Sequence, residues 1–485
     1  MNILFLVPPA DLNKQKKPVD RVYGCNYGYD YKPAIHLLSL ATTAKQAGCR
    51  VEFLDCPAEG YNSKRLVHYL GSHRDIDAVV FFSVWLSRQE DLAAADLAGS
   101  ISPEVKIIFS GPYPTWKPEI FLKNSNYIVL RGEPEGTLTE LIRFLKSGDD
   151  RLSEIKGISF SKENRVIDNP MRELQSLDTL AWPDRRLLKG EYYFNRLDFY
   201  PATVMYASRG CSHSCTYCAP QAMDQAIELE SLRFNLTKPA LRLKGAQDVI
   251  QEFQEISALG YRGVELCDNQ FPWGQDRMVE ICEGIRPLKL KWICNARADS
   301  LQDKSLLRLM QEAGCQLIYI GTESFNQAIL DDVHKGLDLK QNYQAVDLLR
   351  ECGIEPEISV LLGASGLEDE RSVLQSISEA KKMKTSFVHY SIALPLPNTK
   401  LYQTAKNKGW MKTGDFVPVD NTLEATLELP LINASRLKMI VRQCYIRQYL
   451  SLRTIQRQIS GCLSGGLVYK IKALVNFLSS QFRRS

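Results

Sequence analysis

Three cysteines lie within eight residues of the chain, in the segment SRGCSHSCTYCAP (208–220). They are Cys211, Cys215 and Cys218, and a tyrosine precedes the last of them. A structural zinc site takes four protein ligands, and no second CxxC or HxxxH pair stands nearby, although His213 lies inside the loop. Disulfide chemistry needs two thiols, whereas thiolates hold an iron–sulfur cluster, normally one for each iron. On the cysteines alone, all three chemistries stay open.

The first 150 residues alternate between short apolar runs and helix-like stretches, which is the rhythm of a doubly wound parallel sheet. Five runs predict buried strands: 2–7, 50–55, 78–83, 106–111 and 127–132. Ser83, Ser110 and Gly111 fall at the ends of two of these strands. Such a sheet keeps its ligand crevice at the carboxyl ends of its strands.

The alternation stops at 151–195, where a small hairpin and a Pro-containing connector are expected, and it resumes from about residue 200. Six further runs predict strands: 202–210, 263–269, 291–297, 317–324, 355–363 and 386–394. Six βα-type units indicate a parallel barrel of the partial (β/α)6 type, with its working loops at the carboxyl ends of the strands. The cysteine segment directly follows the first of these strands.

The fold class is therefore α/β, and we expect four parts. They are a Rossmann-like domain at 1–150, a linker at 151–195, a partial TIM barrel at 196–420 and a basic helical C-terminal region at 421–485.

Basic residues concentrate at the C-terminal end. The formal net charge is +4, yet residues 436–485 hold ten Lys or Arg and no acidic residue, so the preceding part carries −6. Apolar residues at helical spacing over 436–459 and 467–482 predict amphipathic helices. Two interpretations stay open: the apolar stripes pack on the barrel, or the helices lie on an anionic membrane surface. Nucleic acid is not expected as a partner, because no stacking platform or RNA module is visible.

The cysteine usage and the N-terminal residues favour a reducing cytoplasm. The 13 cysteines are scattered apart from the one cluster, unlike a secreted disulfide framework. The start MNILFLVPPADLN lacks the basic region and cleavage site of a signal peptide. No apolar run reaches the roughly 18 to 20 residues that span a bilayer, so any membrane contact is expected to be peripheral.

The cysteine segment resembles that of the radical S-adenosylmethionine (SAM) superfamily. The shared features are the CxxxCxxC spacing, the aromatic residue before the last cysteine, the preceding SRG (208–210) and the place after a first barrel strand. The resemblance implies that Cys211, Cys215 and Cys218 hold a [4Fe–4S] cluster whose open iron binds the amino and carboxylate groups of SAM. It also implies that reduction of the cluster cleaves SAM and releases a 5′-deoxyadenosyl radical.

Polar residues at three later strand ends resemble the superfamily's SAM contacts. Asp268 in ELCDNQF stands at the position where, in the superfamily, a carboxylate holds the methionyl amino group. Arg297 in CNARAD stands where a side chain points to the nucleotide, and Glu323 in YIGTES stands at the position of a further polar ligand of SAM. LLGASGLEDE (361–370) and LPLPNTKLY (394–402) resemble the fifth- and sixth-strand segments. The shared order of these segments carries the resemblance, since a lone acid after a strand is often only a helix cap.

The N-terminal part resembles the cobalamin-binding domain of one class of the superfamily. Its landmarks follow successive strands: PP (8–9), Ser83, SGPYPT (110–115) and RGEPEGTL (131–138). The resemblance implies that Ser83, Ser110 and Gly111 lie at the cobalamin. Many such domains carry a histidine after the first strand that ligates cobalt from below, but residues 8–35 contain none. The lower cobalt ligand therefore stays undetermined.

Together these resemblances, over about residues 1 to 415, favour a cobalamin-dependent C-methyltransferase acting on an unactivated carbon through methylcobalamin and the 5′-deoxyadenosyl radical. An oxidative cyclase or ring-rearranging enzyme of the same architecture and a non-catalytic iron–sulfur or cobalamin sensor remain as alternatives. The expected partners are an external donor of the flavodoxin or ferredoxin type and a small-molecule, lipid or peptide substrate. Sequence alone does not determine the substrate, a catalytic base, the reductant or the oligomeric state.

Overall fold

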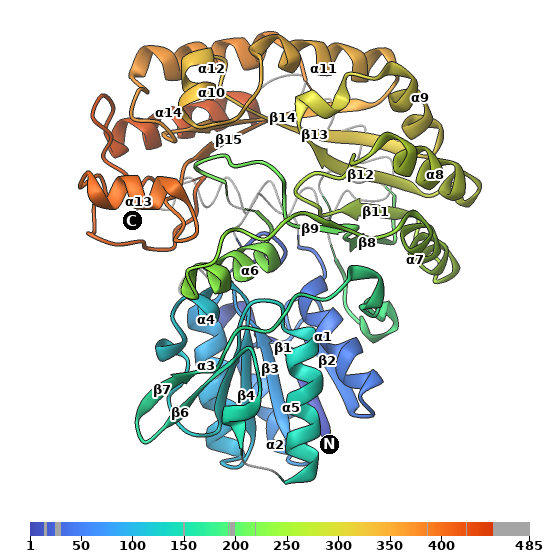
Figure 1. Ribbon diagram of the computed structural model, residues 1–485, viewed down its shortest axis with the longest axis vertical. Coiled ribbons are helices and arrows are strands. Elements are labelled where there is room, and N and C mark those ends of the chain that lie inside the picture. The colour runs from blue at the N-terminus through green and yellow to red at the C-terminus, as the bar shows by residue number, and fades with distance from the viewer. Residues whose placement is uncertain are drawn as a thin grey trace. The chain divides into compact units, whose positions relative to one another are not determined.

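The computed structural model describes residues 1–13, 17–24, 31–148, 151–192, 194, 199–218, 220–385, 387–422 and 424–449. The chain divides by its contacts into two units, whose elements are labelled in Figure 1. Unit 1 comprises Met1–Cys25, Tyr31–Tyr192 and Pro220–Lys244, and unit 2 comprises Asn26–Asp30, Tyr193–Ala219 and Gly245–Ser485. The helix expected at 467–482 lies outside the described residues.

Unit 1 is built on a seven-stranded sheet in the order β2-β1-β3-β4-β5-β6-β7. The strands are β1 (Asn2–Val7), β2 (Arg50–Asp55), β3 (Ala78–Phe82), β4 (Lys106–Ser110), β5 (Tyr127–Leu130), β6 (Ile158–Lys162) and β7 (Arg165–Asp168), with β10 (Arg242–Leu243) outside this sheet. The first five strands pair in parallel, and β6 and β7 form an antiparallel hairpin that continues the sheet beyond β5. The five predicted strands and the hairpin are confirmed.

Helices cover both faces of this sheet, because α1 packs beside α5 and α2 beside α3. The helices are α1 (Ile35–Gln46), α2 (Ser63–Ser72), α3 (Arg88–Ile101), α4 (Pro112–Trp116), α5 (Glu135–Ser147) and α6 (Ala222–Arg233). Every residue of β3 is buried, as expected for a strand covered on both faces. In the order 2-1-3-4-5 the switch point lies between β1 and β3, so a ligand crevice is expected at their carboxyl ends.

Helix α6 follows the cysteine segment in the sequence but belongs to unit 1 by its contacts. It packs on α4, and its Glu230 lies 3.0 Å from the buried Arg131 at the end of β5. Gln225 of α6 accepts a 2.5 Å hydrogen bond from Trp85. The sequence alone groups this helix with the barrel, since it comes directly after the first barrel strand.

Unit 2 contains six parallel strands in the order β15-β14-β13-β12-β11-β8, with β8 and β15 at the edges. The strands are β8 (Ala202–Met205), β11 (Gly263–Leu266), β12 (Lys291–Ala296), β13 (Cys315–Glu323), β14 (Glu355–Leu362) and β15 (Val388–Ile392), and the short β9 (Ser208–Arg209) follows β8. All six predicted strands are present. This is the partial barrel that the sequence predicts.

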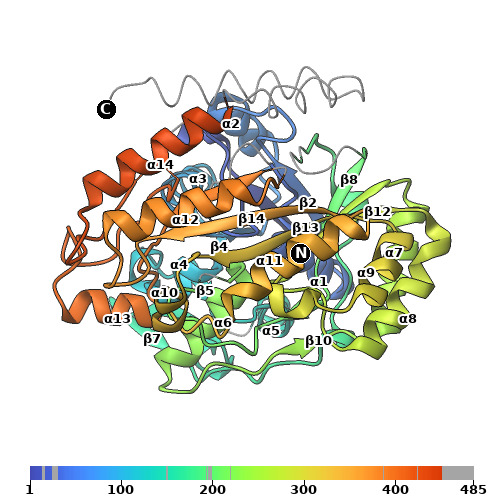
Figure 2. The same cartoon turned by 90° about the horizontal axis from the view of Figure 1, so that it is seen from above.

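The helices of unit 2 follow the strands in turn. They are α7 (Ala246–Ala258), α8 (Gln275–Ile285), α9 (Lys304–Glu312), α10 (Gln327–Asp332), α11 (Leu339–Glu351), α12 (Glu370–Lys382), α13 (Lys400–Asn407) and α14 (Ala434–Tyr449). Helices α11 and α12 run alongside β14, as both views show (Figures 1 and 2). Alternate strand residues, such as Ile318 and Ile320, pack into the core toward these helices. The intervening residues form the inner face of the sheet.

The position of α14 distinguishes between packing on the barrel and contact with a membrane for part of the basic C-terminal region. Its apolar residues, including Leu437 and Val441, are buried in the core of unit 2. The Tyr445 hydroxyl donates to the Tyr390 carbonyl at 2.8 Å. The apolar stripe of this helix therefore packs on β15 rather than facing a membrane. Among the described helices, none combines the length and apolar character of a membrane-spanning segment.

Candidate functional site

The three clustered cysteines differ from the other cysteines of the described chain in their exposure. Cys211, Cys215 and Cys218 are all partly exposed, whereas the other eight described cysteines are buried. The three lie on the loop that leaves the carboxyl end of β8 and β9. A reactive or metal-binding thiol needs this access, while a buried thiol is inert. Their partial exposure therefore makes these three the cysteines that are accessible for metal binding or reaction.

The loop is anchored between its second and third cysteines. The backbone N–H of Thr216 donates to the carbonyl of Val333 at 3.0 Å, and the Thr216 carbonyl accepts from Leu401 N–H at 2.8 Å. Leu401 belongs to LPLPNTKLY, so the sixth-strand segment contacts the cysteine loop. His213 is stacked on Trp273, with ring centroids 5.9 Å apart. Within the described residues no set of three or more His, Cys, Asp or Glu is arranged to hold a metal ion.

Arg297 and Glu323 lie at the carboxyl ends of the neighbouring strands β12 and β13, and both bind Lys335. Lys335 Nζ donates to Glu323 Oε1 at 3.1 Å, and Arg297 Nη2 donates to the Lys335 carbonyl at 2.7 Å. Arg297 Nη1 also lies 3.8 Å from Cys215 Sγ. The structure thus brings Arg297 to Cys215 and links it to Glu323 through Lys335.

Two further observations mark this place as strained and electrostatically unusual. Glu323 has a φ of 61°, a left-handed conformation that residues other than glycine seldom adopt, and such strain clusters at functional sites. Burial, followed by the charges of Glu323 and Cys215, raises the pKa of Tyr217 well above its ordinary value. Tyr217 is the aromatic residue before the last cysteine, so it stays a neutral hydrogen-bond donor beside Glu323.

Asp268 lies at the carboxyl end of β11 and is 1% exposed. Its carboxylate accepts the backbone N–H of Ala207 at 3.0 Å and the hydroxyl of Ser208. Burial raises the pKa of Asp268 to about 6, although these two hydrogen bonds oppose the shift. The side chain is therefore directed at the residues that precede the cysteine loop.

The glycine-containing segment after β14 is a turn held by its own glutamate. Glu368 accepts backbone N–H groups of Gly363, Ala364 and Ser365 at 2.8 to 3.0 Å. A Cβ added to Gly366 would lie 2.7 Å from the Trp410 ring, so glycine is required there for packing. The contacts of this segment explain its conformation without a cofactor.

The carboxyl ends of β3 and β4 in unit 1 fit a bound group. Ser83 and Ser110 are both fully buried, and neither hydroxyl has a hydrogen-bond partner among the described residues. Gly111 has a φ of 103°, and a Cβ added there would lie 2.5 Å from the Ser83 carbonyl oxygen. Buried hydroxyls without partners are costly unless a ligand satisfies them, and glycine at 111 is required because the ends of β3 and β4 approach each other closely there.

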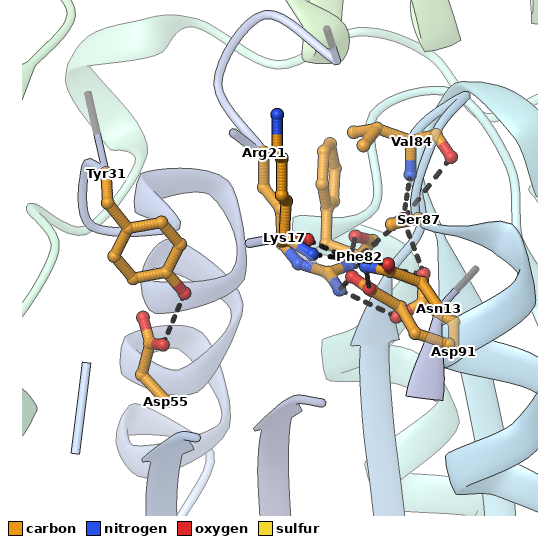
Figure 3. A network of polar contacts seen from close by, with 10 residues as sticks. Asn13, Lys17, Arg21, Tyr31, Asp55, Phe82, Val84, Ser87 and Asp91 are labelled. Atoms are coloured by element: carbon orange, nitrogen blue, oxygen red, sulfur yellow. Dashed lines mark hydrogen bonds and ion pairs between the residues drawn. The ribbon is translucent and has the colours of Figure 1, made fainter. Parts of the chain in front are cut away.

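A buried polar network holds the chain that follows β1 (Figure 3). Arg21 donates to Glu90 and Asp91 at 2.9 Å and to the Phe82 carbonyl, at the end of β3, at 2.7 Å. The Tyr31 hydroxyl donates to Asp55 at 2.5 Å. His36, the nearest histidine, is buried on α1 with its ring 5.2 Å from the ring of Phe82.

The inner face of the six-stranded sheet carries a titratable group that the sequence patterns did not indicate. His389 Nε2 lies 3.1 Å from Glu357 Oε2, and the His389 ring meets the Tyr319 ring edge-on at 5.0 Å. These residues come from β15, β14 and β13. They alternate with core residues along each strand, so the period-2 alternation of a strand would have assigned them to the face opposite the helices.

Lys335 is the other residue that sequence reasoning missed. It is 5% exposed and follows His334, whose φ is 53°. The only local signal is a basic residue next to Gly336 in a loop, which is common on protein surfaces. Its pairing with Glu323 depends on the tertiary structure.

Comparisons with known proteins cover both units. The family model described as the Radical SAM superfamily matches residues 205–377, and the one described as the B12 binding domain matches residues 21–142. The first match contains all three exposed cysteines, Asp268, Arg297 and Glu323. The second contains Ser83, Ser110 and Gly111.

Relatives extend over nearly the whole chain. An uncharacterised methyltransferase of Pyrococcus horikoshii is 26% identical over 468 residues, which is 95% of this chain and 95% of the relative. The anaerobic magnesium-protoporphyrin IX monomethyl ester cyclase of Synechocystis sp. is 25% identical over 78% of this chain and 72% of the cyclase. The structure of the cobalamin-dependent SAM radical enzyme OxsB has a TM-score of 0.70 at 17% identity, covering 99% of this chain and 70% of OxsB. That likeness shows a shared fold.

Proposed function

The chain is a radical SAM enzyme that carries a B12-binding domain, and from this premise we propose that it methylates an unactivated carbon of its substrate. Its cofactors are those of the two domains, a [4Fe–4S] cluster, SAM and cobalamin. The observation that carries the proposal is the presence, in one chain, of a loop with three partly exposed thiols and of two strand ends whose buried hydroxyls have no hydrogen-bond partner among the described residues. The relative that covers 95% of the chain is itself described as a methyltransferase.

The exposed thiols of Cys211, Cys215 and Cys218 are the proposed cluster ligands. When bound, the cluster supplies the electron that cleaves SAM, and cobalamin carries the methyl group. Arg297, 3.8 Å from Cys215 Sγ, places a positive charge beside a thiolate. The side chains of Lys335 and Glu323 form an ion pair and are 6% and 14% exposed, respectively. They therefore place an ammonium and a carboxylate group, largely shielded from water, where a zwitterionic ligand could bind both.

In unit 1 the proposed cobalamin contacts are Ser83, Ser110 and Gly111. The two hydroxyls would hydrogen-bond a polar group of the bound cofactor, and glycine at 111 keeps the ends of β3 and β4 close together beside them.

The reaction needs an external electron donor, for which we propose a flavodoxin or ferredoxin in the cytoplasm, with a small molecule, lipid or peptide as substrate. Peripheral membrane contact would fall to the C-terminal residues beyond α14, which lie outside the described chain.

The first test is metal content. The protein is purified without oxygen, reconstituted with iron, sulfide and hydroxocobalamin, desalted and analysed for iron and cobalt. About four irons and one cobalt per chain support the proposal, whereas iron without cobalt refutes the cobalamin part. A triple Cys→Ala variant at 211, 215 and 218 should lose the iron. A matched triple variant at the buried Cys49, Cys282 and Cys352 should keep it.

The second test separates methylation from the two alternatives. A methyltransferase converts one SAM into S-adenosylhomocysteine and another into 5′-deoxyadenosine, so both should appear in the reduced reaction. A cyclase, as the Synechocystis relative is described, would give 5′-deoxyadenosine without S-adenosylhomocysteine. A sensor would give neither product.

A further inference from the structure

The segment that leads into the cysteine loop is held by side chains from the end of the neighbouring strand β11. The Asp268 carboxylate accepts the Ala207 N–H through both oxygens, at 3.0 and 3.1 Å, and also binds the Ser208 hydroxyl. Asn269 Nδ2 donates to the Gly210 carbonyl at 3.2 Å. Arg277 donates to the Ala207 carbonyl at 3.3 Å. In residues 207–210, both backbone N–H and backbone carbonyl groups are therefore hydrogen-bonded to side chains from the end of β11 and from α8.

Asp268 is itself held in place. Asn295 of β12 donates to the Asp268 carbonyl at 2.8 Å, and the carboxylate is 1% exposed. A carboxylate has about four acceptor positions; here the Ala207 N–H is shared by both oxygens, the Ser208 hydroxyl binds one of them, and the surrounding protein covers the residue. Little of its surface is left for a ligand.

We propose that Asp268 is a positioning residue, which fixes the exit of the chain toward Cys211, and that it does not bind SAM directly. The proposal rests on the assignment of Cys211, Cys215 and Cys218 as cluster ligands. It changes the role expected for Asp268 from the family resemblance, in which a carboxylate at this place holds the methionyl amino group.

The clamp matters because it fixes the chain immediately before the first of the three cysteines. The backbone of the loop is fixed at Thr216, which binds Val333 and Leu401, and at residues 207–210. Cys211 lies directly after the second anchor. Groups that orient metal ligands are worth about 10- to 100-fold in metal affinity, so loosening 207–210 should release iron rather than weaken SAM binding.

The test uses the full-length, reconstituted protein and two variants of the clamp. Ser208→Ala removes one hydroxyl, and Asp268→Asn keeps the shape of the side chain but removes its charge. Iron extraction by a chelator should be about three- to tenfold faster in Ser208→Ala and faster still in Asp268→Asn, because a hydrogen bond to a charged group contributes more than one between neutral groups. SAM affinity of the fraction that retains its cluster, measured by the EPR change of the reduced cluster on SAM addition, should stay within about twofold.

Glu323→Gln is the matched control, since Glu323 is a proposed SAM contact. It should weaken SAM binding and leave iron extraction unchanged. The clamp is refuted if Asp268→Asn behaves in the same way, with normal iron extraction and weakened SAM binding.

Circular dichroism and the urea unfolding midpoint report whether each variant chain is still folded. If Asp268→Asn, which lies in unit 2, fails to fold, the milder Ser208→Ala variant decides. A wild-type chain that binds no iron would refute the proposed function itself, a result distinct from normal iron retention in both clamp variants.

Discussion

Arg21 and Asp91, which are 70 residues apart in the sequence, are joined by two hydrogen bonds of 2.9 and 3.2 Å. Glu90 accepts a third bond from the same guanidinium at 2.9 Å, and all three side chains are buried. The network fastens the chain after β1 to the first turn of α3, beside the end of β3 (Figure 3). Through its bond to the Phe82 carbonyl, Arg21 holds the end of β3 directly before Ser83, one of the proposed cobalamin contacts.

Replacing Arg21 by methionine should destabilise unit 1 strongly. The two carboxylates would remain buried without their cation, and breaking a buried ion pair in this way costs about 3 to 5 kcal/mol. Urea unfolding measures the change. Arg50→Met is the control, because Arg50 lies 4.0 Å from Asp75 with both side chains exposed, and its effect should stay within about 0.5 kcal/mol. Equal midpoints for the two variants would contradict the role of the network.

Gly111→Ala should abolish or strongly reduce cobalamin binding. The added Cβ would meet the Ser83 carbonyl oxygen at 2.5 Å, and the φ of 103° disfavours any side chain. Gly60→Ala serves as the control, since Gly60 also has a positive φ but nothing within 4 Å of the added Cβ. Cobalt per chain after reconstitution with hydroxocobalamin distinguishes the two. Wild-type cobalt in Gly111→Ala would place the cobalamin elsewhere.

Stability should depend on pH through Asp55. Burial raises its pKa to about 6 from an ordinary value near 3.8, against the hydrogen bond from Tyr31 and the charge of Arg21. A raised folded-state pKa contributes stability below the unfolded pKa, and this contribution is lost as the pH rises through about 6. Asp55→Asn removes the titration. The melting temperature of the variant minus that of the wild type should therefore become more positive from pH 4.5 to about 7.5, and a flat difference would contradict the shift.

The pair of His389 and Glu357 on the inner face of the sheet is expected to serve the substrate rather than SAM. His389→Phe should keep its iron and its SAM affinity within about twofold, because His389 contacts Glu357, Tyr319 and Phe387 on β13 to β15. It should still release 5′-deoxyadenosine without substrate but lose methylated product. Weak SAM binding, as expected for Glu323→Gln, would instead assign His389 to the cofactor site.

Much of the fold was predictable from local patterns. The apolar runs ending at Val7, Phe82 and Leu266 are strands because continuous burial on a parallel sheet requires them to be apolar. The roles of single polar residues were harder to predict. Asp268 looks like a ligand in sequence, but its partners Ala207 and Ser208 lie 61 and 60 residues away and become neighbours only because β11 pairs with β8.

The three-cysteine segment, the order of strands and helices, and the polar residues at the strand ends are all evident from the amino-acid sequence, because each depends on spacing along the chain. Three features depend on the tertiary structure alone. Cys211, Cys215 and Cys218 are partly exposed while Cys294 and Cys315 are buried, α6 packs with unit 1, and Lys335 binds Glu323. Burial and hydrogen-bond partners depend on which strands lie side by side, and that arrangement is fixed by the packing of the whole sheet rather than by any local stretch of residues.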